Sequence, residues 1–186
     1  MNILVANDDG IEARGMRELV NALSVKADIY VCAPDSQRSA SGHGITVSEP
    51  IVAEEVSYEN AKAALKLSGT PADCVKLGMK IFQDRGIKID MVFSGINHGG
   101  NLGTDTLYSG TVSAAVEGSI CGVPSVAVSV NSHEATHFDY ACELAVKAME
   151  KSAGRISPDT VLNINTPDLP KEKIKGLKYT TLGKRE

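Results

Sequence analysis

The sequence lacks both an apolar run of membrane-spanning length and a long basic stretch. Because a membrane-spanning helix needs about 20 consecutive apolar residues, the first absence argues against a membrane protein. Duplex nucleic acid is bound through clustered Lys and Arg, so a formal net charge of -4 without a long basic stretch argues against that class, while a mononucleotide substrate remains compatible. The N-terminus passes directly into an apolar strand without a signal peptide, so we expect a cytoplasmic protein.

Several catalytic and metal-binding motifs are also absent. The sequence contains no G-x-x-x-x-G-K-[ST] loop, no G-x-G-x-x-G turn after a strand and no G-x-S-x-G elbow. Kinase-like, dinucleotide-binding and α/β-hydrolase functions therefore lose their support. The four cysteines show no C-x-x-C spacing. We expect reduced cysteines, mostly in the core.

Composition and periodicity predict a globular α/β protein. With 42% hydrophobic and 23% charged residues, the 186-residue chain is long enough to bury about two-thirds of the surface that its unfolded form exposes. We expect one domain over residues 1–186. Apolar runs predict strands at 2–6, 28–33, 90–93, 125–130 and 161–164. Helical periodicity and capping signals predict helices at 14–26, 70–82, 111–121 and 138–149.

This alternation predicts a mostly parallel, Rossmann-like sheet inside a three-layer α/β/α sandwich. Alternating apolar and polar residues at 46–58 predict a small antiparallel β-hairpin excursion. Two segments rich in Gly and Ser, 34–44 and 94–110, are expected to be long loops. Long loops in a compact domain are usually functional.

Four polar stretches lie at the ends of predicted strands or in the loops that follow. They are Asn7-Asp8-Asp9-Gly10, the loop around Ser39, Ser94-Gly95-Ile96-Asn97 and Tyr108-Ser109-Gly110-Thr111. Ligands of open α/β sheets bind beyond the carboxyl ends of the strands, so we expect these stretches to meet in one cleft. Two carboxylates, neutral oxygen ligands and a hydroxyl-rich helix start suit one Mg²⁺-type cation beside a phosphate. The leading interpretation is a metal-assisted phosphohydrolase.

Each stretch also has a purely structural interpretation. Asp8 and Asp9 are predicted cation ligands, because two adjacent negative charges raise a carboxyl pKa unless a cation lies between them. The alternative is that one of the two carboxylates caps a helix. Composition alone favours a turn serine for Ser39. Asn97 is either an oxygen ligand or an Asn in a left-handed turn, and Asn101 is either a phosphate donor or a turn residue.

The segment Ser109-Gly110-Thr111 is predicted to open a helix. Its free backbone N–H groups and positive dipole end suit an anion, and ordinary hydroxyl capping is compatible with that role. His43 and His98 border the predicted cleft. A histidine there is able to protonate a leaving oxygen, but a loop histidine without a catalytic role explains the same pattern.

Five segments extend over nearly the whole chain: NILVANDDGIEARGM, VCAPDSQRSASGHGIT, SGTPADCV, VFSGINHGGNLGTDTLYSGTVSAAVEG and LNINTPDLP. In this order they resemble the sequence blocks of the SurE family of stationary-phase survival proteins. The resemblance implies a nucleotidase that removes phosphate from nucleoside 5′- and 3′-monophosphates with one divalent cation per subunit, Mg²⁺ or Mn²⁺. Some members of the family also act on short polyphosphate.

The resemblance also implies roles for individual residues. The implied cation ligands are Asp8, Asp9, Ser39 and Asn97, and the first two and Asn97 are also implied to be catalytic. The implied phosphate- and substrate-binding residues are Asn101, Ser109, Gly110 and Thr111. Family members usually continue beyond a segment like Gly183-Lys184-Arg185 into a tail used in subunit exchange, whereas this sequence stops there. The homodimer or homotetramer that the resemblance implies is therefore expected less firmly.

The implied mechanism is in-line attack on phosphorus by a water that the cation activates. Asp8 or Asp9 would orient this water, and Gly110 and Thr111 would hold the non-bridging oxygens of the phosphate. A phosphoaspartate on either carboxylate is the competing route. Two interpretations without catalysis also remain, namely a nucleotide-binding regulatory module and a scaffold whose Gly-rich loops serve only as turns.

Overall fold

The computed structural model describes residues 1–38, 41–152 and 156–184. Within them, seven strands form one sheet in the order β3-β4-β2-β1-β5-β6-β7, and β3–β4 is its antiparallel pair. The strands are β1 (Asn2–Ala6), β2 (Asp28–Pro34), β3 (Ala53–Val56), β4 (Ala63–Leu67), β5 (Met91–His98), β6 (Ser125–Val130) and β7 (Val161–Thr166). The helices are α1 (Arg14–Ser24), α2 (Pro71–Asp84), α3 (Gly110–Ile120) and α4 (Asp139–Ser152), with short 3-10 helices η1 (Gly103–Leu107) and η2 (Lys171–Lys173).

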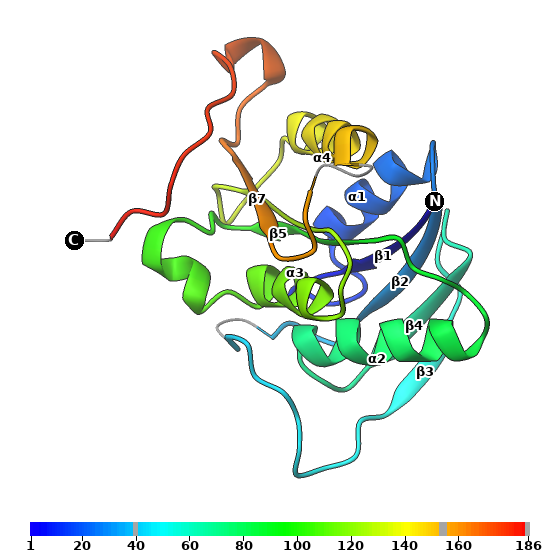
Figure 1. Cartoon of the computed structure of the whole chain (residues 1–186). Helices are drawn as coiled ribbons and strands as arrows, with labels where there is room; N and C mark the ends of the chain where they lie inside the picture. Colours follow the sequence, from blue (N-terminus) through cyan, green and yellow to red (C-terminus); the bar gives the residue numbers. More distant parts are fainter. Residues whose placement is uncertain (39–40, 153–155, 185–186) are drawn as a thin grey trace.

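Helices cover both faces of the sheet, which confirms the predicted three-layer α/β/α sandwich (Figure 1). Side chains of β1 alternate between the two layers. Ile3 and Val5 join the cluster beneath α1 and α4, whereas Leu4 and Ala6 join the cluster beneath α2 and α3. A strand buried on both faces carries a continuous apolar run, which explains the segment NILVA. Among the described helices, none is long and apolar enough to cross a membrane.

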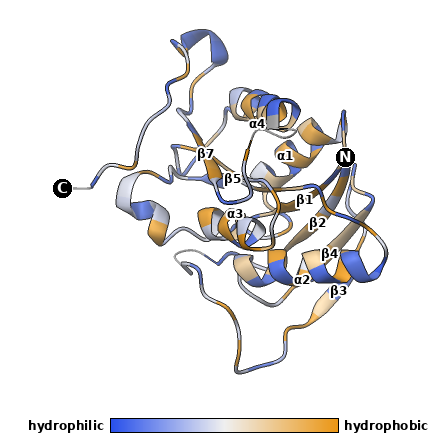
Figure 2. Ribbon diagram, in the orientation of Figure 1, coloured by the Kyte–Doolittle hydropathy of each residue, from blue (hydrophilic) through white to orange (hydrophobic). Residues whose placement is uncertain are grey.

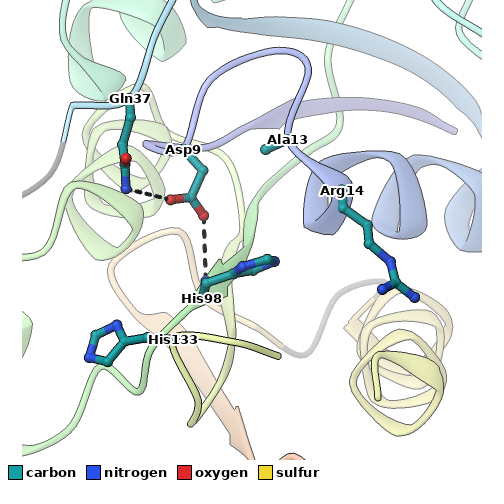
Figure 3. A pocket seen from close by; sticks show the side chains of 6 residues that line it. All are labelled: Asp9, Ala13, Arg14, Gln37, His98 and His133. Atoms are coloured by element: carbon teal, nitrogen blue, oxygen red, sulfur yellow. Dashed lines mark hydrogen bonds between the residues drawn. The ribbon is translucent and has the colours of Figure 1, made fainter. Parts of the chain in front are cut away.

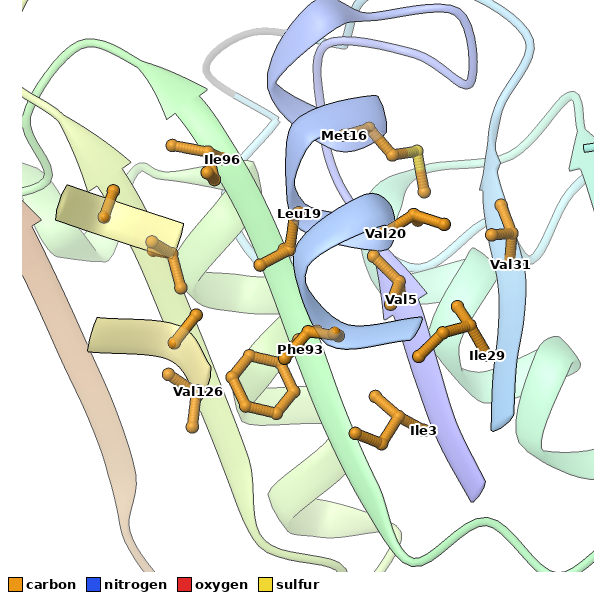
Figure 4. Close-up of a cluster of buried hydrophobic side chains, with 14 of the residues drawn as sticks. Ile3, Val5, Met16, Leu19, Val20, Ile29, Val31, Phe93, Ile96 and Val126 are labelled. Carbon is orange, nitrogen blue, oxygen red and sulfur yellow. The ribbon is translucent and has the colours of Figure 1, made fainter. Parts of the chain in front are cut away.

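The packing of α1 illustrates how one helical layer is held. Met16, Leu19 and Val20 recur at helical spacing and are fully buried against the sheet, where Ile3 and Phe93 lie beneath them (Figure 4). Figure 2 shows the same division on a larger scale, with hydrophobic central strands and the hydrophilic η2 segment at the periphery. Burial of these apolar side chains therefore fixes α1 over the centre of the sheet.

The antiparallel excursion differs from its predicted position. Residues 46–52 lie outside regular structure, and the hairpin is formed by β3 and β4, of which β4 was not predicted. Because β4 also pairs in parallel with β2, the hairpin extends the edge of the main sheet. The five-residue β4 is short, so its local propensity is weak and pairing with β2 decides its structure.

The direction of winding changes at β1. From β1 the chain builds outward through β2 and β4 on one side, and through β5, β6 and β7 on the other. In doubly wound sheets, the crevice beyond the carboxyl ends of the two strands at such a switch point binds ligands. The strands here are β1 and β5, with Ala6 in register with Ser94. The fold therefore places the residues after β1 beside the end of β5.

A buried carboxylate ties the loop after β2 to the start of α2. The Asp73 side chain accepts hydrogen bonds from the backbone N–H of Thr70 at 2.9 Å and from the Thr46 hydroxyl at 2.6 Å. Burial raises the pKa of Asp73, but the hydrogen bonds from Thr46 and Thr70 outweigh burial and hold the pKa below its usual value. Asp73 therefore both caps α2 and anchors the segment 41–52.

We expect Asp73→Asn to lower the free energy of unfolding by about 1–2 kcal/mol at about pH 7. Because the folded-state pKa is lowered, the carboxylate stabilises the protein above the unfolded-state pKa of about 4, and this contribution is lost as pH falls through the folded-state value. Urea unfolding across this range should show the two proteins converging in acid. Asp84→Asn, on the exposed surface of the same helix, should change stability by less than about 0.5 kcal/mol. An equal loss in both variants would contradict the role of Asp73.

Candidate active site

Residues from β1 and β5 meet at the switch point of the sheet. Asp8 and Asp9 follow the last residue of β1, and Asn97 lies near the end of β5. The Asp9 Oδ2 atom accepts a hydrogen bond from the backbone N–H of His98 at 3.4 Å. The pairing of β5 with β6 slips in register between Ser94 and Asn97, and such a bulge re-aims the side chains that follow it. The predicted meeting of these stretches is therefore observed for the β1 and β5 residues.

Asp8 is buried and contacts the start of α3. Its Oδ1 atom accepts a hydrogen bond from the hydroxyl of Thr111, which is fully buried. Burial raises the pKa of Asp8 to about 6; the Thr111 hydrogen bond opposes this shift, and the negative charge of Asp9 adds to it. The carboxylate form of Asp8 is thus destabilised here, which is the situation that a bound cation would relieve.

The start of α3 lies directly against Asp8. Ser109 is the N-cap, and its hydroxyl accepts a hydrogen bond from the backbone N–H of Val112 at 3.1 Å. A Cβ atom added to Gly110 would lie 2.7 Å from the Asp8 Cβ atom, so only glycine permits this approach. The Thr111 backbone N–H also hydrogen-bonds to Asp8, and the remaining N–H group of Gly110 and the positive dipole of this helix start suit an anion beside that carboxylate.

A cavity of about 420 Å³ lies on the Asp9 side of the carboxylate pair. Figure 3 shows Asp9 between Gln37 and His98, with Arg14 on one side and His133 on the other. Gln37 donates to Asp9 Oδ1 at 3.3 Å. The volume falls in the range of pockets that bind small molecules.

Four buried polar atoms at this end of the sheet have no hydrogen-bond partner within the described part of the chain. They are Asn7 Oδ1, Ser41 Oγ, Ser94 Oγ and His98 Nε2. Buried polar groups are normally hydrogen-bonded, so their concentration here points to a ligand with several polar contacts. No group of three or more His, Cys, Asp or Glu gathers among the residues described. A cation here would accordingly need neutral oxygens beside the two carboxylates, and this neighbourhood supplies them.

The remaining predicted residues occupy different settings. Asn97 donates its side-chain N–H to the Gly99 carbonyl at 2.8 Å, which fixes the orientation of the amide. Asn101 is buried and donates to Ser129 Oγ at 2.8 Å, so its observed role is to anchor the loop after β5. Ser39 lies outside the described residues.

His43 and His98 differ in orientation. His43 Nε2 lies 2.8 Å from Oε2 of Glu117, a buried residue of α3 whose other oxygen accepts from Lys76 at 3.0 Å. This contact holds the segment 41–52 against α3. The His98 ring instead lines the cavity and packs on Phe138, with 5.4 Å between ring centroids. Of these two histidines, His98 is therefore the one that lines the Asp9 cavity.

Four residues of this neighbourhood were not predicted: Arg14, Gln37, His133 and the buried Ser41 hydroxyl. Arg14, Gln37 and Ser41 belong to no short motif whose spacing marks a function. His133 opens the H-E-x-x-H segment 133–137, but this segment is not helical, so its two histidines do not share one helix face as in a zinc site of that type. The loop composition around Ser41 was a signal, but it pointed equally to turns. Only the three-dimensional convergence of α1, the loop after β2 and the loop after β6 identifies them.

Fold and site together define a doubly wound α/β protein with a polar ligand site, built from paired carboxylates and a helix start, at its switch point. The sequence matches the family model described as Survival protein SurE over residues 3–186. The chain belongs to the SurE family. This confirms the resemblance inferred from the sequence segments.

Comparison with individual proteins agrees. The chain is 51% identical to a protein of Heliobacterium modesticaldum named 5′-nucleotidase SurE, and the match covers 100% of this chain and 68% of that protein. It is 46% identical to the protein of the same name from Petrotoga mobilis, with 73% of that protein covered. The crystal structure of the SurE protein from Aquifex aeolicus superposes with a TM-score of 0.89 at 41% identity, covering 100% of this chain and 73% of that one.

Gly110 provides a direct test of the packing of α3 against the carboxylates. We expect Gly110→Ala to lower the free energy of unfolding by about 1–3 kcal/mol, because the new methyl group overlaps Asp8 and approaches Ser41 Oγ to 3.0 Å. Alanine at an uncrowded helical position would instead stabilise by up to about 1 kcal/mol. Urea unfolding separates the two outcomes, and a variant more stable than the wild type would contradict the observed contact.

Proposed function

We propose that this protein is a divalent-metal-dependent phosphomonoester hydrolase that releases phosphate from nucleoside 5′- and 3′-monophosphates. The observation that carries the proposal is the contact between Asp8 and the start of α3, which sets a cation-type ligand pair beside an anion-binding position. The relatives named 5′-nucleotidase, at 46–51% identity over the full length of this chain, support the same activity. Short polyphosphate is a further proposed substrate.

We propose that Asp8, Asp9, Ser39 and Asn97 hold one Mg²⁺ or Mn²⁺ ion. The unpartnered buried oxygens of Asn7, Ser41 and Ser94 nearby support a site with oxygen ligands. When bound, such a cation would supply Lewis-acid polarisation of a phosphoryl oxygen and lower the pKa of water. Since Mg²⁺ and Mn²⁺ accept similar oxygen ligands, the donor set does not separate them.

The protein's own residues would then position the reaction. The backbone N–H groups of Gly110 and Thr111 bind the non-bridging phosphate oxygens, where negative charge must be stabilised. The Thr111 hydroxyl holds the Asp8 carboxylate, and Ser109 caps the helix that presents those N–H groups. Asp9, held by Gln37 and the His98 backbone, orients the attacking water in line with the departing nucleoside oxygen. Asn101 shapes the loop that follows Asn97.

Several finer properties are part of the same proposal. Residues 1–186 form one cytoplasmic domain that assembles as a homodimer or homotetramer. Exposed apolar side chains in the extended segment that follows η2, among them Leu177, Tyr179 and Leu182, support association with another surface.

Phosphate release from AMP, GMP and their 3′ isomers tests the activity. We expect turnover with Mn²⁺ or Mg²⁺, none with EDTA, and a loss of about a hundredfold or more in Asp9→Asn, because the amide cannot orient water as a carboxylate does. Asp84→Asn, exposed on α2, is the matched control and should retain full activity. Absence of release from every substrate with both metals would favour a nucleotide-binding module without turnover. Recovery of a phosphorylated Asp8 or Asp9 would favour the phosphoaspartate route over attack by water.

Metal binding is tested separately by thermal unfolding. In EDTA we expect Asp8→Asn to be more stable than the wild type by about 1–2 kcal/mol, or about 2–8 °C, because the amide still accepts the Thr111 hydrogen bond but has no buried charge. Mn²⁺ at a hundred times its dissociation constant should raise the wild-type midpoint by about 5–10 °C. The variant should lose most of this rise, and an undiminished rise would place the cation elsewhere.

A further inference from the structure

The cavity beside Asp9 is lined mainly by hydrogen-bond donors. Arg14, Gln37, His98 and His133 surround it, Ala13 is its apolar lining residue, and Asp9 is its carboxylate. A nucleobase binds by stacking on aromatic or apolar side chains, and among these lining residues the two histidine rings and Ala13 provide such surfaces, whereas Arg14 and Gln37 do not. A lining rich in cationic and neutral donors suits an anionic group instead.

Arg14 is held in place at the rim of this cavity. Its guanidinium carbon lies 5.1 Å from the ring centroid of the buried Phe138, and its Nε atom lies 3.4 Å from Glu18 Oε1. The Glu18 contact uses Nε, so the terminal guanidinium nitrogens remain available to a ligand. This fork matches the oxygens of a phosphate in a bidentate manner.

Two independent features point to the same place. The N-cap of α1 is Ala13, which makes no side-chain cap, and the first turn of α1 carries no acidic residue. Its free N–H groups and positive dipole therefore remain without a counter-charge from that turn. The His98 ring lines the same cavity, and its Nε2 atom lacks a hydrogen-bond partner among the described residues. Arg14, Gln37 and the start of α1 form a donor set beyond that of the α3 position.

We propose that this cavity binds a second phosphate group of the substrate, and that the protein therefore prefers nucleotides phosphorylated on both ends of the ribose, such as a nucleoside 3′,5′-bisphosphate. The inference rests on the proposed function, because Asp9 must be neutralised by the proposed cation for an anion to lie beside it. The scissile phosphate occupies the start of α3 on the Asp8 side, and the second phosphate occupies the Arg14 side. Arg14 is thus a specificity-determining residue.

Isothermal titration calorimetry with Ca²⁺ in place of Mg²⁺ or Mn²⁺ provides the test, because the proposal needs a cation at Asp9 and Ca²⁺ accepts the same kind of oxygen ligands. A phosphate assay of the samples afterwards checks that the nucleotides remain intact. The dissociation constants of AMP and adenosine 3′,5′-bisphosphate are compared in the wild type, Arg14→Gln and Arg17→Gln. Arg17 lies in the same helix and pairs with Glu12, so its variant removes the same charge without touching the cavity. We expect the bisphosphate to bind about tenfold more tightly than AMP in the wild type and Arg17→Gln, and about equally in Arg14→Gln.

The inference is overturned if the wild type shows no preference for the bisphosphate, or if both variants retain or lose the preference to the same extent. Phosphate release from AMP with Mn²⁺, measured on the same samples, separates this result from the proposed function. An Arg14-dependent preference without turnover would support the second phosphate position and refute the hydrolase. Turnover of AMP with no Arg14-dependent preference would support the hydrolase and refute the second phosphate position.

Discussion

The hydrogen bond from the Thr111 hydroxyl to the Asp8 carboxylate is the contact on which the site depends. It joins the end of β1 to the start of α3, two segments 103 residues apart in the sequence, and both side chains are buried. A buried carboxylate is costly unless it is paired, and this charge-assisted hydrogen bond offsets only part of that cost. The proximity requires glycine at 110, and it requires β1 at the centre of the sheet. The order of the strands, the position of the α3 start and the burial of the Asp8 carboxylate therefore depend on one another.

Much of the fold follows from local sequence. The segments NILVA and SVAVSV are buried on both faces of the sheet. Mostly apolar runs of this kind predict parallel strands, and the predicted bounds of these two strands, 2–6 and 125–130, agree with the structure. β4 was missed, and β5 extends beyond its predicted end, because each owes its pairing to a neighbour far away in the sequence. For the site, Asp8, Asp9 and Thr111 were predicted to converge because they follow strands that end at one edge. Arg14 and Gln37 belong to no motif, and the H-E-x-x-H spacing that begins at His133 does not point to this site, so only tertiary structure assembles the three residues.

The unpartnered atoms of Asn7, Ser41, Ser94 and His98 show where this sequence departs from optimal burial. Elsewhere in the core, apolar side chains on both faces of β1 and on one face of β6 pack in hydrophobic clusters. Departures from consistent burial are expected at functional positions, where a ligand completes the hydrogen bonding that the protein leaves open. They concentrate here at the switch point, on both sides of the carboxylate pair. The two sides of the pair differ. The start of α3 lies on the Asp8 side, and the cavity with Arg14 at its rim lies on the Asp9 side.

The segment 41–52 is held to the helices by two buried carboxylates, Glu117 of α3 through His43 and Asp73 of α2 through Thr46. Apart from these ties it has no regular structure and few buried side chains. The Gly42 N–H also donates to the Tyr108 carbonyl, and the Thr70 hydroxyl donates to the Gly44 carbonyl. We expect the segment to leave the body when these few contacts break, so that its backbone amides exchange with solvent deuterium at a free energy well below that of the central strands. By this measure the segment would be a unit of stability separate from the sheet.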